Sequence, residues 1–246
     1  MKDLKIRKDL TKLSSIKKVL AIIPARKGSV GVKNKNIRLI NNKPLIDFTV
    51  QSLKMSNLID KIVITTNDER IISYYKFDKK LLIIKRSHNI SNPKSTSSEY
   101  VDDVLKKINK TDSYIPKTIL IAQPTSPLRS TLDINNAINK YNLGNKKSLI
   151  SVCKAEGMRH PKDMYILKNN NEVRHLIRPK KKYETRDEYF RVYQRNGCIY
   201  LFDYHFFKKF KKVKSHNPDI YIMPWERSIN IDIEDDFKIA KCLLKK

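Results

Sequence analysis

A short basic segment near the amino end of the chain has the composition of a phosphate-binding loop. It reads PARKGSVGVKNKN over residues 24–36. Small residues let backbone amides approach phosphate oxygens, while an arginine and a lysine supply the charge that holds a triphosphate and neutralises its leaving part. The segment matches neither the P-loop pattern nor the Rossmann G-x-G-x-x-G fingerprint, which disfavours an ATPase and a dehydrogenase. The residues concerned are Gly28, Ser29, Gly31, Arg26 and Lys35.

A second polar segment, SINID at residues 228–232, alternates polar and apolar residues. Asn230 and Asp232 alternate along what we expect to be an extended chain, so both side chains face the same side. Asp235 and Asp236 are expected to form the acidic first turn of the last helix rather than to bind metal.

These segments follow or adjoin runs that predict an α/β fold with a mostly parallel sheet. Short β-branched runs alternate with helical patterns, which is typical of βαβ units. In such folds ligands bind beyond the carboxyl ends of the strands, where the polar segments lie. The predicted strands are residues 19–25, 61–66, 81–85, 118–122, 148–153, 197–202 and 220–223, and the predicted helices are residues 45–55, 68–75, 99–108, 132–141, 204–210 and 235–244.

Four segments together resemble the acylneuraminate cytidylyltransferase family, the CMP-sialic acid synthetases. They are IIPARKGSVGVKNKN, AQPTSPLRS at 122–130, NGCIY at 196–200 and MPWERSINID at 223–232, in the family's order and with its spacing. The resemblance covers nearly the whole chain. It implies a Rossmann-like, mostly parallel sheet flanked by helices, of the nucleotide-diphospho-sugar transferase type, with a small dimerisation insertion.

On the nucleotide side, the resemblance implies that Arg26 and Lys35 hold the triphosphate and stabilise the pyrophosphate that leaves. Further nucleotide-binding positions match Ala25, Gly28, Ser29, Asn36, Arg86, Ser97 and Ser98. Ser97 or Ser98 is also expected to be a helix N-cap. The family usually has a lysine where this chain has Val30. One phosphate contact is therefore either missing or supplied by Lys27 or Lys33.

On the sugar side, the resemblance places Gln123 and the neighbouring Arg129 in the active cleft. Arg186 falls on the family's sugar-binding arginine, and a second family arginine corresponds to Gln194, beside Arg195. An arginine pairs with a carboxylate through two hydrogen bonds, which suits an acidic sugar. Lys162 is a third candidate cation in this region, whereas His160 is expected to be structural.

The resemblance also implies a Mg²⁺ cofactor and a homodimer. The family typically has aspartates at both polar positions of the last motif, so Asp232 and Asn230 are the expected metal ligands, and the neutral Asn230 predicts weaker magnesium affinity or a metal held by Asp232 and the triphosphate. The dimerisation insertion is expected at about residues 158–190, reaching over the sugar site of the partner, within one domain of residues 18–246 that follows a charged extension, residues 1–17.

The overall composition sets further expectations. The net charge is +27, but the lysines are scattered and no RNA-binding signature accompanies them, so a nucleic-acid partner is not expected. The three cysteines lie far apart and are expected to be small buried hydrophobes. No run is long and apolar enough to span a membrane, and the amino end lacks a signal-peptide pattern, so we expect a cytoplasmic protein.

The function expected from these observations is the transfer of CMP from CTP to a nine-carbon acidic sugar of the sialic-acid type, with release of pyrophosphate. The sequence leaves open the same reaction on legionaminic, pseudaminic or 3-deoxy-octulosonic acid, because Gln194 stands where the family has a sugar-binding arginine. A second alternative, motivated by Asn230 and Val30, is a catalytically weak relative that binds the nucleotide only.

Overall fold

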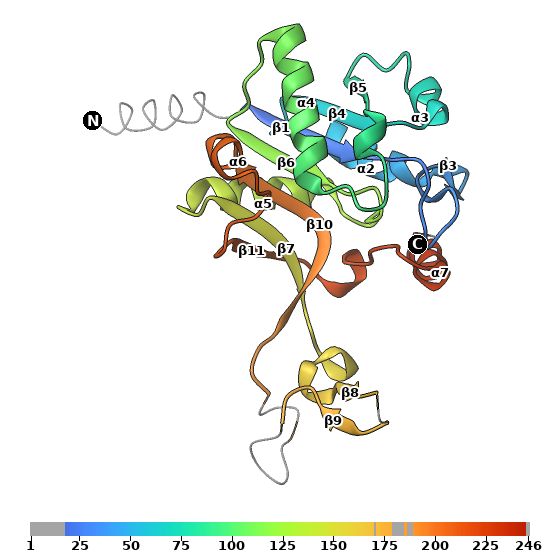
Figure 1. Ribbon diagram of the computed structural model, residues 1–246, viewed down its shortest axis with the longest axis vertical. Helices are drawn as coiled ribbons and strands as arrows, with labels where there is room; N and C mark the ends of the chain where they lie inside the picture. Colours follow the sequence, from blue (N-terminus) through green and yellow to red (C-terminus); the bar gives the residue numbers. More distant parts are fainter. Residues whose placement is uncertain (1–17, 170, 179–184, 186–188, 245–246) are drawn as a thin grey trace.

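The computed structural model describes residues 18–169, 171–178, 185 and 189–244 (Figure 1). Its centre is a seven-stranded sheet with the order β11-β7-β10-β6-β1-β4-β5. All neighbouring pairs are parallel except those of β10, which is antiparallel to both β6 and β7. The strands are β1 (Val19–Pro24), β4 (Lys61–Thr66), β5 (Leu81–Lys85), β6 (Thr118–Ala122), β7 (Ser148–Lys154), β10 (Tyr193–Asp203) and β11 (Asp219–Ile222).

Helices cover both faces of this sheet, as the α/β prediction requires. Successive residues of β1 point to opposite faces. Ala21 and Ile23 pack in one cluster with α2 (Leu45–Lys54), α3 (Glu69–Tyr74) and α5 (Thr131–Leu143). Leu20 and Ile22 pack in another with α4 (Ser97–Asp112) and α6 (Tyr204–Phe210). Because both faces are buried, β1 is apolar throughout rather than alternating.

The last helix closes one end of the molecule and supports the acidic segment before it. In α7 (Glu234–Leu243), Phe237 and Ala240 pack on Val32, Ile229 and Ile231 in a third buried cluster. Asp236 in its first turn accepts hydrogen bonds from the backbone N–H groups of Asp232 and Ile233, at 2.8 and 3.0 Å. This bears out the assignment of Asp236 to the helix start.

The segment between β7 and β10 extends away from the sheet (Figure 1). Its described part contains the 3₁₀ turns η3 (Gly157–Arg159) and η4 (Pro161–Asp163) and the antiparallel hairpin of β8 (Tyr165–Leu167) and β9 (Val173–His175). Residues 158–190, the predicted insertion, fall within this segment. The predicted extension at 1–17 lies outside the described residues.

Several expectations are wrong in detail. Thr96, rather than Ser97 or Ser98, caps α4: its hydroxyl accepts from the Glu99 N–H and Glu99 accepts from the Thr96 N–H in a capping box. Cys153 and Cys198 are buried, but Cys242 is exposed. Two short strands, β2 (Leu39–Ile40) and β3 (Lys43–Pro44), were not predicted.

Candidate active site

The four motif segments converge at the carboxyl edge of the sheet. The loop after β1 and the segment at 228–232 touch at Gly31, where an added Cβ would lie 2.0 Å from the carbonyl oxygen of Asp232. The same acidic segment is tied to the loop after β6 by a 2.8 Å hydrogen bond from the Ile231 N–H to the Thr125 carbonyl. It also lies against β10, since a Cβ on Gly197 would sit 3.5 Å from the Asn230 amide.

The loop after β1 is held at its two ends. The Ala25 N–H donates to the Thr65 carbonyl at 2.9 Å, which extends the strand pairing, and the Thr66 hydroxyl donates to the Ala25 carbonyl at 2.6 Å. The Asn36 amide donates to the Arg26 carbonyl at 3.1 Å and so pins the two ends of the loop together. Asn36 therefore shapes the loop. Gly28 has a φ of 83°, a conformation that glycine adopts without strain.

The Arg26 and Lys35 side chains occupy different surroundings. The Arg26 guanidinium folds back on its own loop and donates to the Gly28 carbonyl at 2.5 Å. The Lys35 ammonium is largely buried, donating to the Ile231 carbonyl at 2.5 Å and lying 3.3 Å from the Asp232 carboxylate. The structure thus joins Lys35 to Asp232 directly. Two of the three N–H donors of the Lys35 ammonium are engaged in these contacts.

Asp232 and Asn230 lie side by side as the alternating pattern predicted. The Asn230 amide donates to the Asp232 carboxylate at 3.1 Å, and the Asp232 side chain is 70% exposed. The buried Asn230 carbonyl oxygen has no hydrogen-bond partner within the described part of the chain. A buried acceptor without a donor is a place where a cation or a water would be stabilised. Across the described residues there is no cluster of three or more carboxylate, histidine or cysteine ligands.

The predicted base-binding residues form a second, buried group. Arg86 donates to the hydroxyl and the carbonyl of Thr65 at 3.3 and 3.2 Å and stacks 4.8 Å from the Tyr100 ring. Burial lowers the pKa of its guanidinium to about 10, and the charge of Arg26 adds to this effect. Ser97 and Ser98 begin α4, half-buried, immediately after the cap.

A cleft of ≈ 540 Å³ opens beside Asp232 and contains the sugar-side candidate Gln194. Gln194 is exposed on β10, opposite Cys153 of β7. The cleft is bounded by β10, the acidic segment and the start of the insertion. Its remaining wall includes Arg159, Arg195, Asn196, Trp225, Asn230 and Asp236. Sequence reasoning did not find Arg159 or Trp225; the available signal was a second basic residue next to His160 and an aromatic residue within the last motif.

The other sugar-side candidates lie apart from this cleft or beyond what is described. Gln123 directly follows β6, half-buried, and its carbonyl accepts from the Thr49 hydroxyl at 3.3 Å. Lys162 is buried in the insertion, with its ammonium 4.6 Å from the Tyr189 ring centroid, so here it contributes to packing. His160 is structural as expected, bonding the Phe190 carbonyl at 2.9 Å. Arg186 lies outside the described residues.

Two arginines of the motifs stabilise the scaffold instead of facing a ligand. Arg129, expected in the active cleft, is 2% exposed and donates to the carbonyls of Gln123 and Cys198, at 3.2 and 2.8 Å. Arg227 pairs with fully buried Asp133 through two hydrogen bonds of 2.8 and 3.0 Å, joining the last motif to α5. The side chain of Arg129 therefore does not point into the active cleft, contrary to the expectation.

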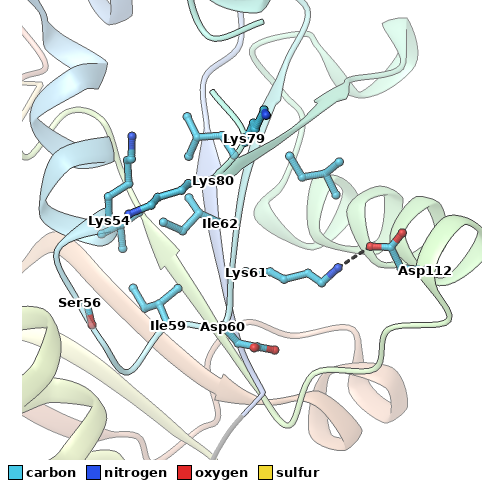
Figure 2. Close-up of a pocket in the computed structure, with 12 residues that line it drawn as sticks. Lys54, Ser56, Ile59, Asp60, Lys61, Ile62, Lys79, Lys80 and Asp112 are labelled. Carbon is cyan, nitrogen blue, oxygen red and sulfur yellow. Dashed lines mark hydrogen bonds and ion pairs between the residues drawn. The ribbon is translucent and has the colours of Figure 1, made fainter. Parts of the chain in front are cut away.

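A separate hollow at the amino ends of β4 and β5 is lined by lysines (Figure 2). Lys61 pairs with Asp112 and Lys54 with Asp78, so two of its cations are already neutralised. Ligands of open α/β sheets bind at the opposite edge. This hollow, which also contains Lys80, is therefore a suitable place for control substitutions that remove charge away from the motifs.

A mixed α/β sheet with a glycine-containing basic loop and an acidic segment at its carboxyl edge defines a nucleotide-binding transferase architecture. The chain belongs to the cytidylyltransferase family, whose model matches residues 20–241. The described residues include no helix that is both long and apolar enough to cross a membrane.

Two curated relatives and one solved structure illustrate the range of the similarity. The N-acylneuraminate cytidylyltransferase of Escherichia coli O18:K1:H7 is 27% identical over 251 residues, covering 93% of this chain but 52% of that protein. The CMP-N,N'-diacetyllegionaminic acid synthase of Campylobacter jejuni is 29% identical over 227 residues, covering 92% and 94%. CMP:2-keto-3-deoxy-manno-octonic acid synthetase complexed with CTP has the same fold, with a TM-score of 0.67, 14% identity and coverage of 93% and 98%. The chain spans about half the length of the curated N-acylneuraminate cytidylyltransferases that it matches.

Proposed function

We propose that this chain transfers the CMP part of CTP to an acidic nine-carbon sugar of the sialic-acid type and releases pyrophosphate. The observation that carries the proposal is the convergence of the basic loop and the acidic segment, through the Lys35–Asp232 contact of 3.3 Å, beside the cleft that holds Gln194. Family membership and the acidic sugars named in both relatives support it. Legionaminic, pseudaminic and 3-deoxy-octulosonic acid are the alternative sugars.

In the proposed reaction, the anomeric hydroxyl of the sugar attacks the α-phosphorus of CTP. A bond forms from the sugar oxygen to that phosphorus, the bond to the β-phosphate bridge breaks, and the hydroxyl proton passes to water. Arg26, Lys35 and the amides near Gly28 and Ser29 stabilise the charge on the departing pyrophosphate. Arg86, which follows β5 and stacks on Tyr100, is the proposed contact for the base.

Magnesium belongs to the same proposal. Asp232 offers an exposed carboxylate and Asn230 a partnerless carbonyl oxygen beside it, which fits a hard cation completed by phosphate oxygens and water. The ion would neutralise phosphate charge and act as a Lewis acid. Lys35 contacts one carboxylate oxygen of Asp232 and Asn230 contacts the other, so both residues help to fix the position of this ligand.

A homodimer is also proposed, with the insertion as the contact. Large apolar side chains of its hairpin are exposed: Tyr165 by 61%, Leu167 by 65% and Val173 by 59%. Exposed apolar groups gathered in one short hairpin are typical of an interface. Light scattering on the purified chain should give twice the 28.9 kDa mass of one chain. The Leu167→Glu variant should give the mass of the monomer.

A pyrophosphate-release assay tests the reaction. Each of the four nucleoside triphosphates is combined with a panel of nonulosonic and ulosonic acids, with and without Mg²⁺. We expect release with CTP alone among the nucleotides, only when an acidic sugar is present, and Arg26→Ala should lower kcat by about 10²-fold or more. Lys80→Ala, in the lysine-lined hollow of Figure 2, is the matched control. CTP binding without turnover of any acid would instead establish the nucleotide-binding alternative.

A further inference from the structure

We propose that Arg159, held against Trp225, is the residue of this chain that binds the carboxylate of the acidic sugar. The inference rests on the proposed function and assigns one ligand group of the substrate to one side chain. Both residues line the cleft that contains Gln194 and Asp232. The family resemblance put the carboxylate-binding arginines at positions 186 and 194, and position 194 holds a glutamine.

Trp225 fixes the guanidinium without using its hydrogen-bond donors. The Arg159 guanidinium carbon lies 4.8 Å from the centroid of the Trp225 ring, an arrangement stabilised by attraction between the cation and the ring face. Trp225 is itself anchored, because its carbonyl accepts from the Ser228 N–H at 2.8 Å and its turn includes Arg227, which is paired with Asp133. Stacking therefore occupies the face of the Arg159 guanidinium and none of its in-plane N–H donors.

One of those donors is buried and has no acceptor. The Nη1 atom of Arg159 is inaccessible to solvent and makes no hydrogen bond to any described residue. Buried donors almost always have partners, and the exceptions need an explanation. A carboxylate is the acceptor best matched to a guanidinium, because both groups are planar and two parallel hydrogen bonds can form. The acidic sugar is the ligand of the proposed reaction that brings such a group into this cleft.

The main chain around Arg159 is held from both sides. Its own N–H donates to the Glu156 carbonyl at 3.2 Å, and the next residue, His160, is buried and bonded to the Phe190 carbonyl. Arg195, the other arginine of the cleft, is exposed to solvent. A charge in water is screened more strongly than a half-buried one, so Arg159 offers the stronger carboxylate site.

The test separates sugar binding from nucleotide binding. Steady-state kinetics are measured for the full chain and for Arg159→Gln, with CTP, Mg²⁺ and the acid that the panel identifies as substrate. We expect the KM for the sugar to rise by ~10–100-fold while the KM for CTP stays within about twofold. Arg159→Lys should restore only part of the loss, since an ammonium has no two-pronged geometry. Trp225→Leu should raise the sugar KM by about 3–10-fold by releasing the guanidinium.

A second readout reports the carboxylate itself. The wild-type chain should prefer the acid over its neutral carboxamide analogue, and Arg159→Gln should lose most of that preference. Lys80→Gln should change neither value. A sugar KM within twofold of wild type in Arg159→Gln, or an unchanged preference for the acid, overturns the assignment while leaving the proposed reaction intact. A wild-type chain that uses no acidic sugar would overturn both. If thermal unfolding shows that the glutamine variant is unfolded, the sugar KM and the preference for the acid are measured on Arg159→Lys instead.

Discussion

Replacing Gly31 by alanine is the most direct perturbation of the candidate site. The added Cβ would lie 2.0 Å from the Asp232 carbonyl oxygen and 3.2 Å from its carbonyl carbon. Carbon and oxygen atoms in close contact are normally about 3.3 Å apart, so one of the two backbones must move by about 1.3 Å. Neither can yield by rotating a side chain. The basic loop and the acidic segment would therefore be pushed apart.

The consequence should appear in catalysis more than in folding. Lys35 contacts both Ile231 and Asp232, so a shift of this size breaks or lengthens its 2.5 and 3.3 Å contacts. Misplacement by about 1 Å costs on the order of 10²-fold in rate, while overpacking costs about 1–3 kcal/mol in stability. We expect Gly31→Ala to lower kcat/KM by about 10²-fold and to raise the Mg²⁺ concentration needed for half-maximal activity. Pyrophosphate release and urea unfolding measure the two effects.

Gly144→Ala provides the matched control. A Cβ there would meet its nearest atoms at 3.4 Å, at the far end of α5, so activity should be unchanged. If Gly31→Ala retained kcat/KM within about threefold of wild type, with the same magnesium dependence, the close approach of the two segments would have no catalytic role and the reasoning would be refuted.

Three further predictions concern metal, stability and thiols. Asn230→Asp should keep activity and lower the magnesium requirement in the release assay; an unchanged requirement would contradict the metal placement. Arg227→Gln should reduce the urea unfolding free energy by about 2 kcal/mol, less than for a fully buried pair because Arg227 is 41% exposed. Burial would raise the pKa of Asp133, but hydrogen bonds from Arg227 and Ser130 lower it overall. The stability lost in Arg227→Gln should therefore be largest above about pH 4 and should shrink as the pH falls through the pKa of Asp133 in the folded chain. At pH 8 a thiol reagent should label exposed Cys242 quickly and Cys198 only on unfolding, because burial raises the Cys198 pKa to about 11; equal rates in a peptide-mapping experiment would disprove this.

The strands were predictable wherever a short run rich in Ile, Leu and Val is bounded by polar residues. Residues 61–66, 81–85 and 118–122 were predicted to the residue as β4, β5 and β6. Strands β4 and β6 are buried almost throughout, whereas β5 is a half-exposed edge strand. The direction of β10 was not predictable, because an apolar run carries no information on which way its neighbours run. The cap of α4 was within reach: Glu99 lies three residues after Thr96, the capping-box spacing that Ser97 and Ser98 lack.

For the site, sequence reasoning identified the segments but not the directions of their side chains. Arg129 has the residue type of a ligand contact, yet its guanidinium satisfies buried carbonyls of the turn that precedes it and of β10. Lys35 was expected at the phosphates, and its contact with Asp232 depends on how α7 supports the acidic segment. Arg159 lines the cleft because the turn η3 that contains it lies beside Trp225. Linear spacing does not encode that proximity.

Asp232 links the stability of the scaffold to the chemistry proposed for it. Its carbonyl packs on Gly31, its N–H is capped by Asp236 and its carboxylate meets Lys35 and Asn230. These contacts come from the first loop, the last helix and the last motif, so all three must be in place before the carboxylate is oriented. The exposed carboxylate of Asp232 is thus positioned by the contacts of its backbone with Gly31 and Asp236. Substitutions at Gly31 or Asp236 should therefore alter metal dependence, although neither residue is an expected metal ligand.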